Sequence, residues 1–200
     1  TGSRGVGKTS CARIFAKAIN NMLDATPEDL AFTIFELDAA SNNGVEDIRA
    51  IVDTVRIPPQ VGKYKVYVID EVHMLSAAAF NAFLKTLEEP PPHAIFILAT
   101  TEKHKITPTI LSRCQIFDFN RIKVKDMTEH LQHICKQEGI EAEEDALHII
   151  AIKADGAMRD ALSIFDQVVA FCGRKLTYDL VIQNLNVLDY EYYFKLTDLF

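Results

Sequence analysis

The sequence has 200 residues, of which 48% are hydrophobic and 24% charged, as in an ordinary globular protein with one or two domains. Its net charge of −7 argues against a protein that coats nucleic acid through bulk positive charge. No apolar run is long enough to span a membrane, and no signal peptide is visible in a sequence that begins inside a motif. The four cysteines are far apart, which predicts reduced, packed thiols rather than a disulfide framework or a zinc signature.

The chain opens on Gly2-Ser3-Arg4-Gly5-Val6-Gly7-Lys8-Thr9, which fits the phosphate-loop pattern G-x-x-x-x-G-K-[ST]. Glycines let such a loop turn its N–H groups toward phosphates, and a helix predicted from Ser10 to about Asn20 would direct its positive dipole end at the same anion. Lys8 would contact the β- and γ-phosphates, and the Thr9 hydroxyl would bind Mg²⁺. A glycine-rich turn before an ordinary helix is the alternative, because a single motif carries false positives.

Strands and helices then alternate along the chain. The predicted strands are 32–37, 65–70, 94–99 and 114–119, and the predicted helices are 45–55, 76–88 and 108–113. Residues 20–31 are polar and predict a connector, and Ser41 or Asn43 is the predicted N-cap of the helix at 45–55. Strands separated by helices predict βαβ units and a parallel sheet.

The strand pattern ends after Asn120, which predicts a second, all-helical domain. The predicted helices are 125–138, 143–154, 158–171 and 178–187, with Gly139, Gly156 and Gly173 as the breaks between them. The aromatic-rich residues 189–200 predict a further helix that opens a third domain.

Two acids follow the apolar strand at 65–70. Ligands of open α/β sheets bind at the carboxyl ends of the strands, so Asp70 would hold Mg²⁺ together with Thr9. Glu71 would orient or deprotonate a water that attacks the γ-phosphate. A solvated acidic pair at a strand end is the alternative, and the phosphate loop upstream argues against it.

Three further features fit the same chemistry. Thr100 and Thr101 follow the next strand, where a hydroxyl would bond the γ-phosphate or the attacking water, or else cap the next turn. Arg113 is either a surface residue or an arginine finger for its own or a neighbouring nucleotide. Arg159 lies near a helix start, where a cation opposes the helix dipole, so a lid arginine reaching a nucleotide competes with a plain ion pair as its explanation.

Together, these motifs closely resemble the gamma/tau subunits of bacterial DNA polymerase III, the motor ATPases of the sliding-clamp loader in the AAA+ superfamily. The resemblance covers nearly the whole chain. It rests on residues 2–9, 70–73, 98–102, 112–114 and 156–160 in this order, and on the linking stretches 36–44 and 80–91.

The resemblance implies an α/β fold: a P-loop AAA+ parallel-sheet domain at 1–121, whose first strand is missing from this chain, and a helical lid domain at 122–188. Residues 189–200 would start a third, helical oligomerisation domain, and the intact protein would be longer. The family usually carries a four-cysteine zinc module where residues 20–31 lie here. That stretch contains no cysteine, so no zinc is expected on this chain.

The resemblance also implies residue roles. The ATP-binding residues would be Gly2, Ser3, Arg4, Gly5, Val6, Gly7, Lys8, Thr9, Ser10 and Arg159. Thr9 and Asp70 would hold Mg²⁺, and Glu71 would be the catalytic acid. Thr101, with Thr100 beside it, would be the first sensor and Arg159 the second.

Other implied residues face outward. Arg113 would complete the site of an adjacent subunit in trans. Lys85 would face a subunit interface, although its spacing alone favours a solvated lysine. Asn42, Asn43 and Gly44 would take a DNA phosphate at a helix start. The implied partners are the same and related clamp-loader subunits, the sliding clamp, primer–template DNA and the polymerase holoenzyme, in the bacterial cytoplasm and away from any membrane.

The leading interpretation is an ATP-hydrolysing motor subunit of the clamp loader in DNA replication. The family is classified with DNA-directed DNA polymerase, yet the sequence shows no polymerase-type pair of metal-binding acids. One alternative is a catalytically silent AAA+ scaffold, which the intact Lys8, Thr9 and Glu71 disfavour. Another is a different AAA+ motor such as a helicase, or a small-molecule P-loop kinase. Arg113 in its Ser-Arg-Cys context and the acid pair disfavour the kinase.

Overall fold

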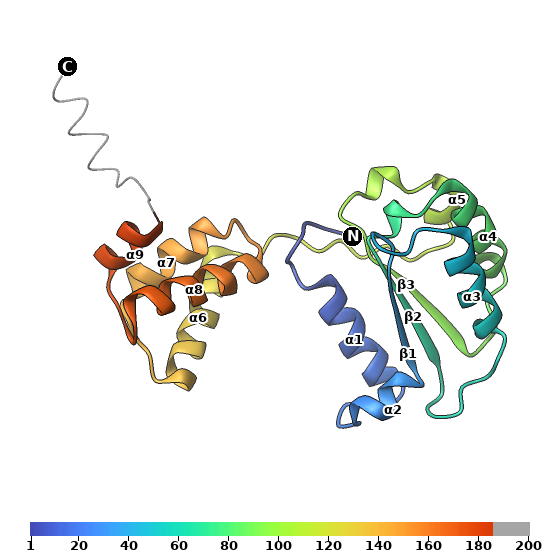
Figure 1. The fold of residues 1–200 in the computed structure, drawn as a ribbon, viewed down its shortest axis with the longest axis horizontal. Coiled ribbons are helices and arrows are strands. Elements are labelled where there is room, and N and C mark those ends of the chain that lie inside the picture. Colours follow the sequence, from blue (N-terminus) through green and yellow to red (C-terminus); the bar gives the residue numbers. More distant parts are fainter. Residues whose placement is uncertain (186–200) are drawn as a thin grey trace, which may run out of the picture. The chain divides into compact units, whose positions relative to one another are not determined.

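The computed structural model describes residues 1–185, so the predicted start of a third domain at 189–200 lies outside the described residues. The chain divides into two compact units (Figure 1). The first comprises Thr1–Gly2 and Gly7–Phe119, and the second comprises Ser3–Val6 and the described residues from Asn120 on. Up to residue 185, no helix is both long and apolar enough to cross a membrane.

The first unit is a parallel three-stranded sheet in the order β1-β2-β3, with helices on both faces (Figure 1). This confirms the predicted βαβ architecture. Its elements are α1 (Lys8–Ile19), α2 (Pro27–Ala31), β1 (Ile34–Asp38), α3 (Val45–Val55), β2 (Lys65–Asp70), α4 (Ala77–Glu88), β3 (Ala94–Leu98) and α5 (Pro108–Leu111). Two short 3₁₀ turns, η1 (Val72–Met74) and η2 (Lys103–Lys105), follow β2 and β3.

The central strand, β2, is buried on both faces. Val66 and Val68 pack against α1, whereas Ile69 belongs to the core formed with α3 and α4. Successive side chains of a strand point to opposite faces, so a strand covered on both sides must be apolar at every position. The sequence of β2 is accordingly apolar or aromatic from Val66 to Ile69, with Lys65 and Asp70 at its two ends.

Asn20 fastens the C-terminal end of α1 to the start of β2. Its side-chain oxygen accepts the N–H groups of Lys63 and Tyr64 at 2.8 and 2.7 Å. Its amide nitrogen donates to the carbonyl oxygens of Ala16 and Tyr64, both at 3.1 Å. The buried amide thus uses two acceptor and two donor positions, which leaves no unpaired polar atom to destabilise the core.

The segment 114–119 is not the strand that its β-rich sequence predicts. Only Phe119 pairs, in an isolated parallel bridge with Gly2. A strand is held by a neighbour along its length, and beside this segment only one residue pair forms before Gly2 turns into the loop.

Two local predictions between α1 and α3 are also wrong. The predicted connector contains α2, because the Thr26 hydroxyl caps its first turn by accepting the N–H of Asp29 at 3.3 Å. The N-cap of α3 is Gly44 rather than Ser41 or Asn43, and the Asp47 carboxylate accepts the Gly44 N–H at 3.1 Å.

The second unit contains the predicted helices, α6 (Val124–Glu138), α7 (Glu144–Lys153), α8 (Met158–Cys172) and α9 (Tyr178–Leu185), around a core of residues such as Leu131, Ile150 and Phe165. It is not all-helical, because β4 (Glu141–Ala142) and β5 (Lys175–Leu176) pair in parallel. Gly139 and Gly173 end α6 and α8 at positive φ values of 65° and 75°, and the chain continues from these turns into β4 and β5.

A substitution of Phe83 in α4 tests whether this residue belongs to the core of the first unit. Its side chain is fully buried and meets the Phe96 ring edge-on at 5.1 Å. We expect Phe83→Ala to lower the free energy of unfolding by about 3–5 kcal/mol, because it removes buried surface and leaves a cavity. Urea unfolding measures this change. The matched control is Phe15→Ala in α1, where the ring is 50% exposed, and equal losses in the two variants would contradict the assignment of the core.

Candidate functional site

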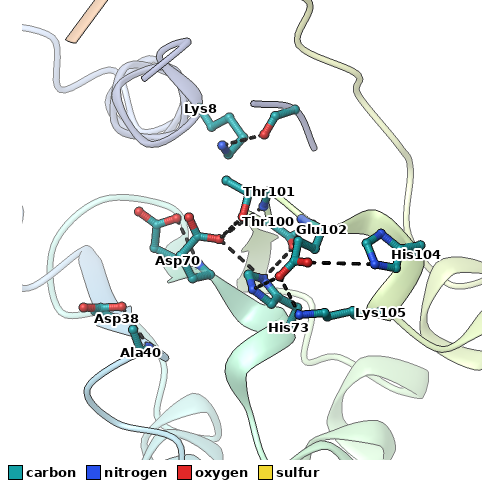
Figure 2. Close-up of polar contacts among 12 residues, drawn as sticks. Lys8, Asp38, Ala40, Asp70, His73, Thr100, Thr101, Glu102, His104 and Lys105 are labelled. Carbon is teal, nitrogen blue, oxygen red and sulfur yellow. Dashed lines mark hydrogen bonds and ion pairs between the residues drawn. The ribbon is translucent and has the colours of Figure 1, made fainter. Parts of the chain in front are cut away.

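The loop before α1 ends in a left-handed turn at Gly7, with φ 94° and ψ 14°. Gly7 is the N-cap of α1, and no side chain caps the helix there. The first N–H groups of a helix have no intrahelical partner and attract anions. Lys8 Nζ donates to the carbonyl oxygen of Gly2 at 2.8 Å, which folds this cation back along the loop (Figure 2). This geometry suits a phosphate group.

The first residues of α1 meet the end of β2. The Thr9 hydroxyl donates to a carboxylate oxygen of Asp70 at 2.8 Å. Two hard oxygen donors therefore lie side by side, as the sequence predicts for a shared Mg²⁺. In the described part of the chain, no group of three or more His, Cys, Asp or Glu residues forms a metal site by itself. Thr9 and Asp70 would thus hold Mg²⁺ together with phosphate and water oxygens, which is how Mg²⁺ usually binds in phosphate sites.

Glu71 has a left-handed backbone, with φ 46° and ψ 44°. This conformation costs an ordinary residue about 1–2 kcal/mol, so the surroundings must hold it. Thr101 does so with two bonds to the same oxygen, Oε2: its N–H donates at 3.1 Å and its hydroxyl at 2.9 Å. The structure thus brings together the predicted catalytic acid and the predicted first sensor.

The sequence analysis gave no role to His73 and Glu102, which lie beside this pair. The His73 side chain is only 6% exposed and lies 2.9 Å from both Thr100 Oγ1 and a carboxylate oxygen of Glu102 (Figure 2). Lys105 Nζ donates to the Glu102 carboxylate at 2.7 Å, and this bond lowers the pKa of Glu102. His73 and Glu102 both lie in the motif stretches 70–73 and 98–102, within four residues of the ends of β2 and β3, and this position was the signal that could have found them.

Asp38 is a further residue to which the sequence analysis gave no role. It ends β1 in register with Asp70, as parallel pairing requires. Its carboxylate accepts the Ala40 N–H at 2.9 Å (Figure 2). It also accepts the Ser41 hydroxyl at 3.2 Å, so it fixes the turn after β1. Asn42 joins the same turn by donating to the Asp38 carbonyl oxygen at 3.2 Å.

The residues predicted to face partners lie elsewhere on the first unit. Arg113 pairs with Glu88 at 2.8 Å and donates to the Thr109 carbonyl oxygen at 2.6 Å. Lys85 is exposed on α4. Asn42 and Asn43 are exposed just before Gly44 starts α3, where a helix N-terminus is present for a phosphate.

Arg159 and residues 3–6 of the loop belong to the second unit. The Arg159 N–H donates to the Gly5 carbonyl oxygen at 3.3 Å. Gly5 has φ 75°, and a Cβ there would lie 3.0 Å from the Cβ of Ala157. Glycine is therefore needed at this point, both for the turn and for the close approach. The role of the Arg159 side chain stays a prediction.

Comparison with solved structures identifies the fold of this chain. Among solved structures, RuvB of Thermotoga maritima, described as a Holliday junction branch migration motor, superposes with a TM-score of 0.72 over 94% of this chain and 60% of that chain. The two are 22% identical, so the likeness shows the fold alone. That fold is the AAA+ parallel sheet, accompanied here by a helical lid.

Family models and relatives then identify the family. The model described as DNA polymerase III, delta subunit, matches residues 1–123, and that of the DNA polymerase III clamp loader subunit ATPase lid domain matches residues 126–174. Curated relatives include the tau subunits of Bacillus subtilis (53% identical over 86% of this chain and 33% of the relative) and Escherichia coli (45%, over 94% and 31%). The chain belongs to the family of bacterial DNA polymerase III gamma/tau subunits, clamp-loader components, and spans about a third of these two relatives.

Thr9 offers a test of the predicted Mg²⁺ position. We expect Thr9→Val to weaken Mg²⁺-dependent ATP binding by about tenfold, because it removes one oxygen ligand while keeping the side-chain shape. Titration of the full-length protein with a fluorescent ATP analogue, with and without Mg²⁺, measures the change. Thr9→Ser keeps the hydroxyl and is the matched control. Equal Mg²⁺ dependence in the two variants would refute the ligand assignment.

Proposed function

We propose that this chain carries the ATP-hydrolysing site of a motor subunit of the DNA sliding-clamp loader, acting in DNA replication within the DNA polymerase III holoenzyme. One observation carries the proposal. The phosphate-loop helix, through Thr9, contacts Asp70, and the next residue, Glu71, is held by Thr101 from the neighbouring strand end. A scaffold subunit that only binds nucleotide does not require the contact between Thr101 and Glu71.

The arrangement of these residues supports a specific role for each of them. The loop N–H groups and Lys8 would bind the ATP phosphates, and Mg²⁺ on Thr9 and Asp70 would neutralise charge on the phosphoryl group. Glu71 would accept a proton from the attacking water or orient it. Thr101 would keep the Glu71 carboxylate at a fixed place and offer a hydroxyl beside it.

The remaining roles extend to neighbouring chains. In this proposal Arg113 completes the nucleotide site of an adjacent subunit, Lys85 faces that interface, and Arg159 is the lid sensor. Asn42, Asn43 and Gly44 contact primer–template DNA. The sliding clamp and other clamp-loader subunits are the partners, the compartment is the bacterial cytoplasm, and this chain carries no zinc.

ATPase assays on the full-length protein, with and without sliding clamp and primed DNA, test the proposal as a whole. Clamp plus primed DNA should stimulate turnover. Strand separation without such stimulation would instead indicate a helicase, and ATP binding without turnover under any condition would indicate a scaffold.

Glu71→Gln tests the catalytic assignment. We expect turnover to fall by about a hundredfold or more, because a general base contributes about 10²–10⁴-fold, while ATP binding is retained. Steady-state hydrolysis and nucleotide titration measure the two properties. Glu129→Gln, on an exposed glutamate of α6, is the matched control. Unchanged hydrolysis in Glu71→Gln would refute the assignment.

Arg113→Ala tests action in trans. We expect the variant chain to bind ATP normally and to reduce hydrolysis in a neighbouring subunit by about a hundredfold, since arginine fingers supply large factors. Complexes assembled from mixtures of variant and wild-type chains measure this. A defect confined to the variant chain's own site would contradict the proposal.

A further inference from the structure

His73 lies between the two strand ends that form the candidate site. We propose that His73 is a positioning residue for ATP hydrolysis, which closes a ring of hydrogen bonds with Thr100 and Glu102 and thereby holds the turn that presents Thr101 to Glu71. The inference rests on the proposed role of Glu71 in ATP hydrolysis. It adds a residue to which neither the motifs nor the family comparison assigns a role.

Three contacts close the ring. His73 Nε2 lies 2.9 Å from Oε2 of Glu102, and His73 Nδ1 lies 2.9 Å from the Thr100 hydroxyl oxygen. The backbone N–H of Glu102 then donates to the same Thr100 oxygen at 3.0 Å. The ring thus links η1, which follows β2, to the turn that follows β3 (Figure 2).

The partners decide where the hydrogens lie. A carboxylate only accepts, so Nε2 carries a hydrogen and donates it to Glu102. The Thr100 hydroxyl oxygen accepts the N–H of Glu102. The same hydroxyl can still donate its own hydrogen, and His73 Nδ1 is the acceptor of that hydrogen. The neutral imidazole with its hydrogen on Nε2 therefore satisfies every group in the ring.

Charged groups surround the ring on both sides. Glu71 Oε2 lies 3.4 Å from Nδ1, on the side of the site. On the other side Glu102 is paired with Lys105 at 2.7 Å and lies 3.9 Å from His104. Lys105 therefore balances the charge of Glu102 on the side away from the site.

The ring acts on Glu71 through Thr101. Thr100 and Glu102 flank Thr101 in sequence, so fixing both of them fixes the N–H and hydroxyl that Thr101 donates to Glu71. The Val72 N–H also donates to the Ala99 carbonyl oxygen at 2.9 Å, which ties the same two segments by their backbones. A catalytic group held by supporting hydrogen bonds keeps its productive geometry, and small displacements of such groups cost rate rather than binding.

Conservative variants separate the two halves of the ring. His73→Asn keeps an acceptor near the place of Nδ1 and loses the reach to Glu102, whereas His73→Gln reaches Glu102 and loses the acceptor for Thr100. His73→Ala removes both. In His73→Asn, Glu102 keeps its bonds to Thr100 and Lys105, so we expect turnover within about twofold of wild type. In His73→Gln and His73→Ala, Thr100 loses its partner, so we expect about a tenfold loss of turnover, with the Kd for ATP unchanged in all three variants.

The experiment uses the full-length protein in its assembled complex, with ATP, Mg²⁺, sliding clamp and primed DNA. Turnover, the Kd for ATP and the melting temperature are measured for each variant. Lys103→Ala is the matched control, because Lys103 lies in the same turn but pairs with Asp118 at 3.5 Å. Glu71→Gln is assayed in parallel, so that loss of the proposed function is seen separately.

The outcomes are distinct. Low turnover of His73→Gln with near-normal turnover of His73→Asn supports the inference. Wild-type turnover in all three variants overturns it, and so does a loss of ATP binding that follows the melting temperature, which would mark a merely structural role. If Glu71→Gln hydrolyses ATP normally, the proposed function fails, whereas an inactive Glu71→Gln beside a normal His73→Ala refutes only the role of His73.

Discussion

Hydrogen bonds at both ends of helix α1 hold the helix against strand β2, and the geometry of the candidate site depends on them. Near its N-terminus the Thr9 hydroxyl bonds Asp70, and at its C-terminus Asn20 bonds the backbone at Lys63 and Tyr64. Between these points the helix presents Ala12 and Ala16 to the sheet, and such small side chains allow a close approach. A helix held at two points cannot slide along the strand, so Lys8 and Thr9 at its start stay in register with Asp70 and Glu71 at the end of β2.

A parallel sheet places the ends of its strands at one edge, and the candidate site uses that edge. Glu71 follows β2 directly and Thr101 comes three residues after the end of β3, and the two residues bond each other across the gap between the strands. The left-handed backbone of Glu71 is unfavourable by about 1–2 kcal/mol, and the two bonds from Thr101 together offset about that much. Strain at Glu71 is therefore tolerable only while the neighbouring turn remains in place.

The sequence predicted the sheet and the meeting of Thr9 with Asp70 well, because apolar runs, helix spacing and the loop motif are local signals. The sequence-based predictions were wrong where the structure of a segment depends on contacts with distant parts of the chain. Residues 114–119 have β-rich side chains, yet Phe119 forms only one bridge. The β4–β5 ladder is two residues long, too short for any pattern to predict. His73 and Glu102 acquire partners only when two strand ends meet, which a linear motif does not reveal.

The contacts of Arg113 within this chain are compatible with its proposed role at a neighbouring subunit. Its ion pair with Glu88 is partly exposed, with side chains 35% and 45% accessible, and pairs of this kind contribute only about 0–1 kcal/mol. A second bond to the Thr109 carbonyl oxygen orients the guanidinium without adding a charge. Phosphate oxygens carry more charge than one carboxylate and accept two parallel bonds from arginine. A neighbour's nucleotide would therefore outcompete Glu88, so this pair can orient the proposed finger without sequestering it.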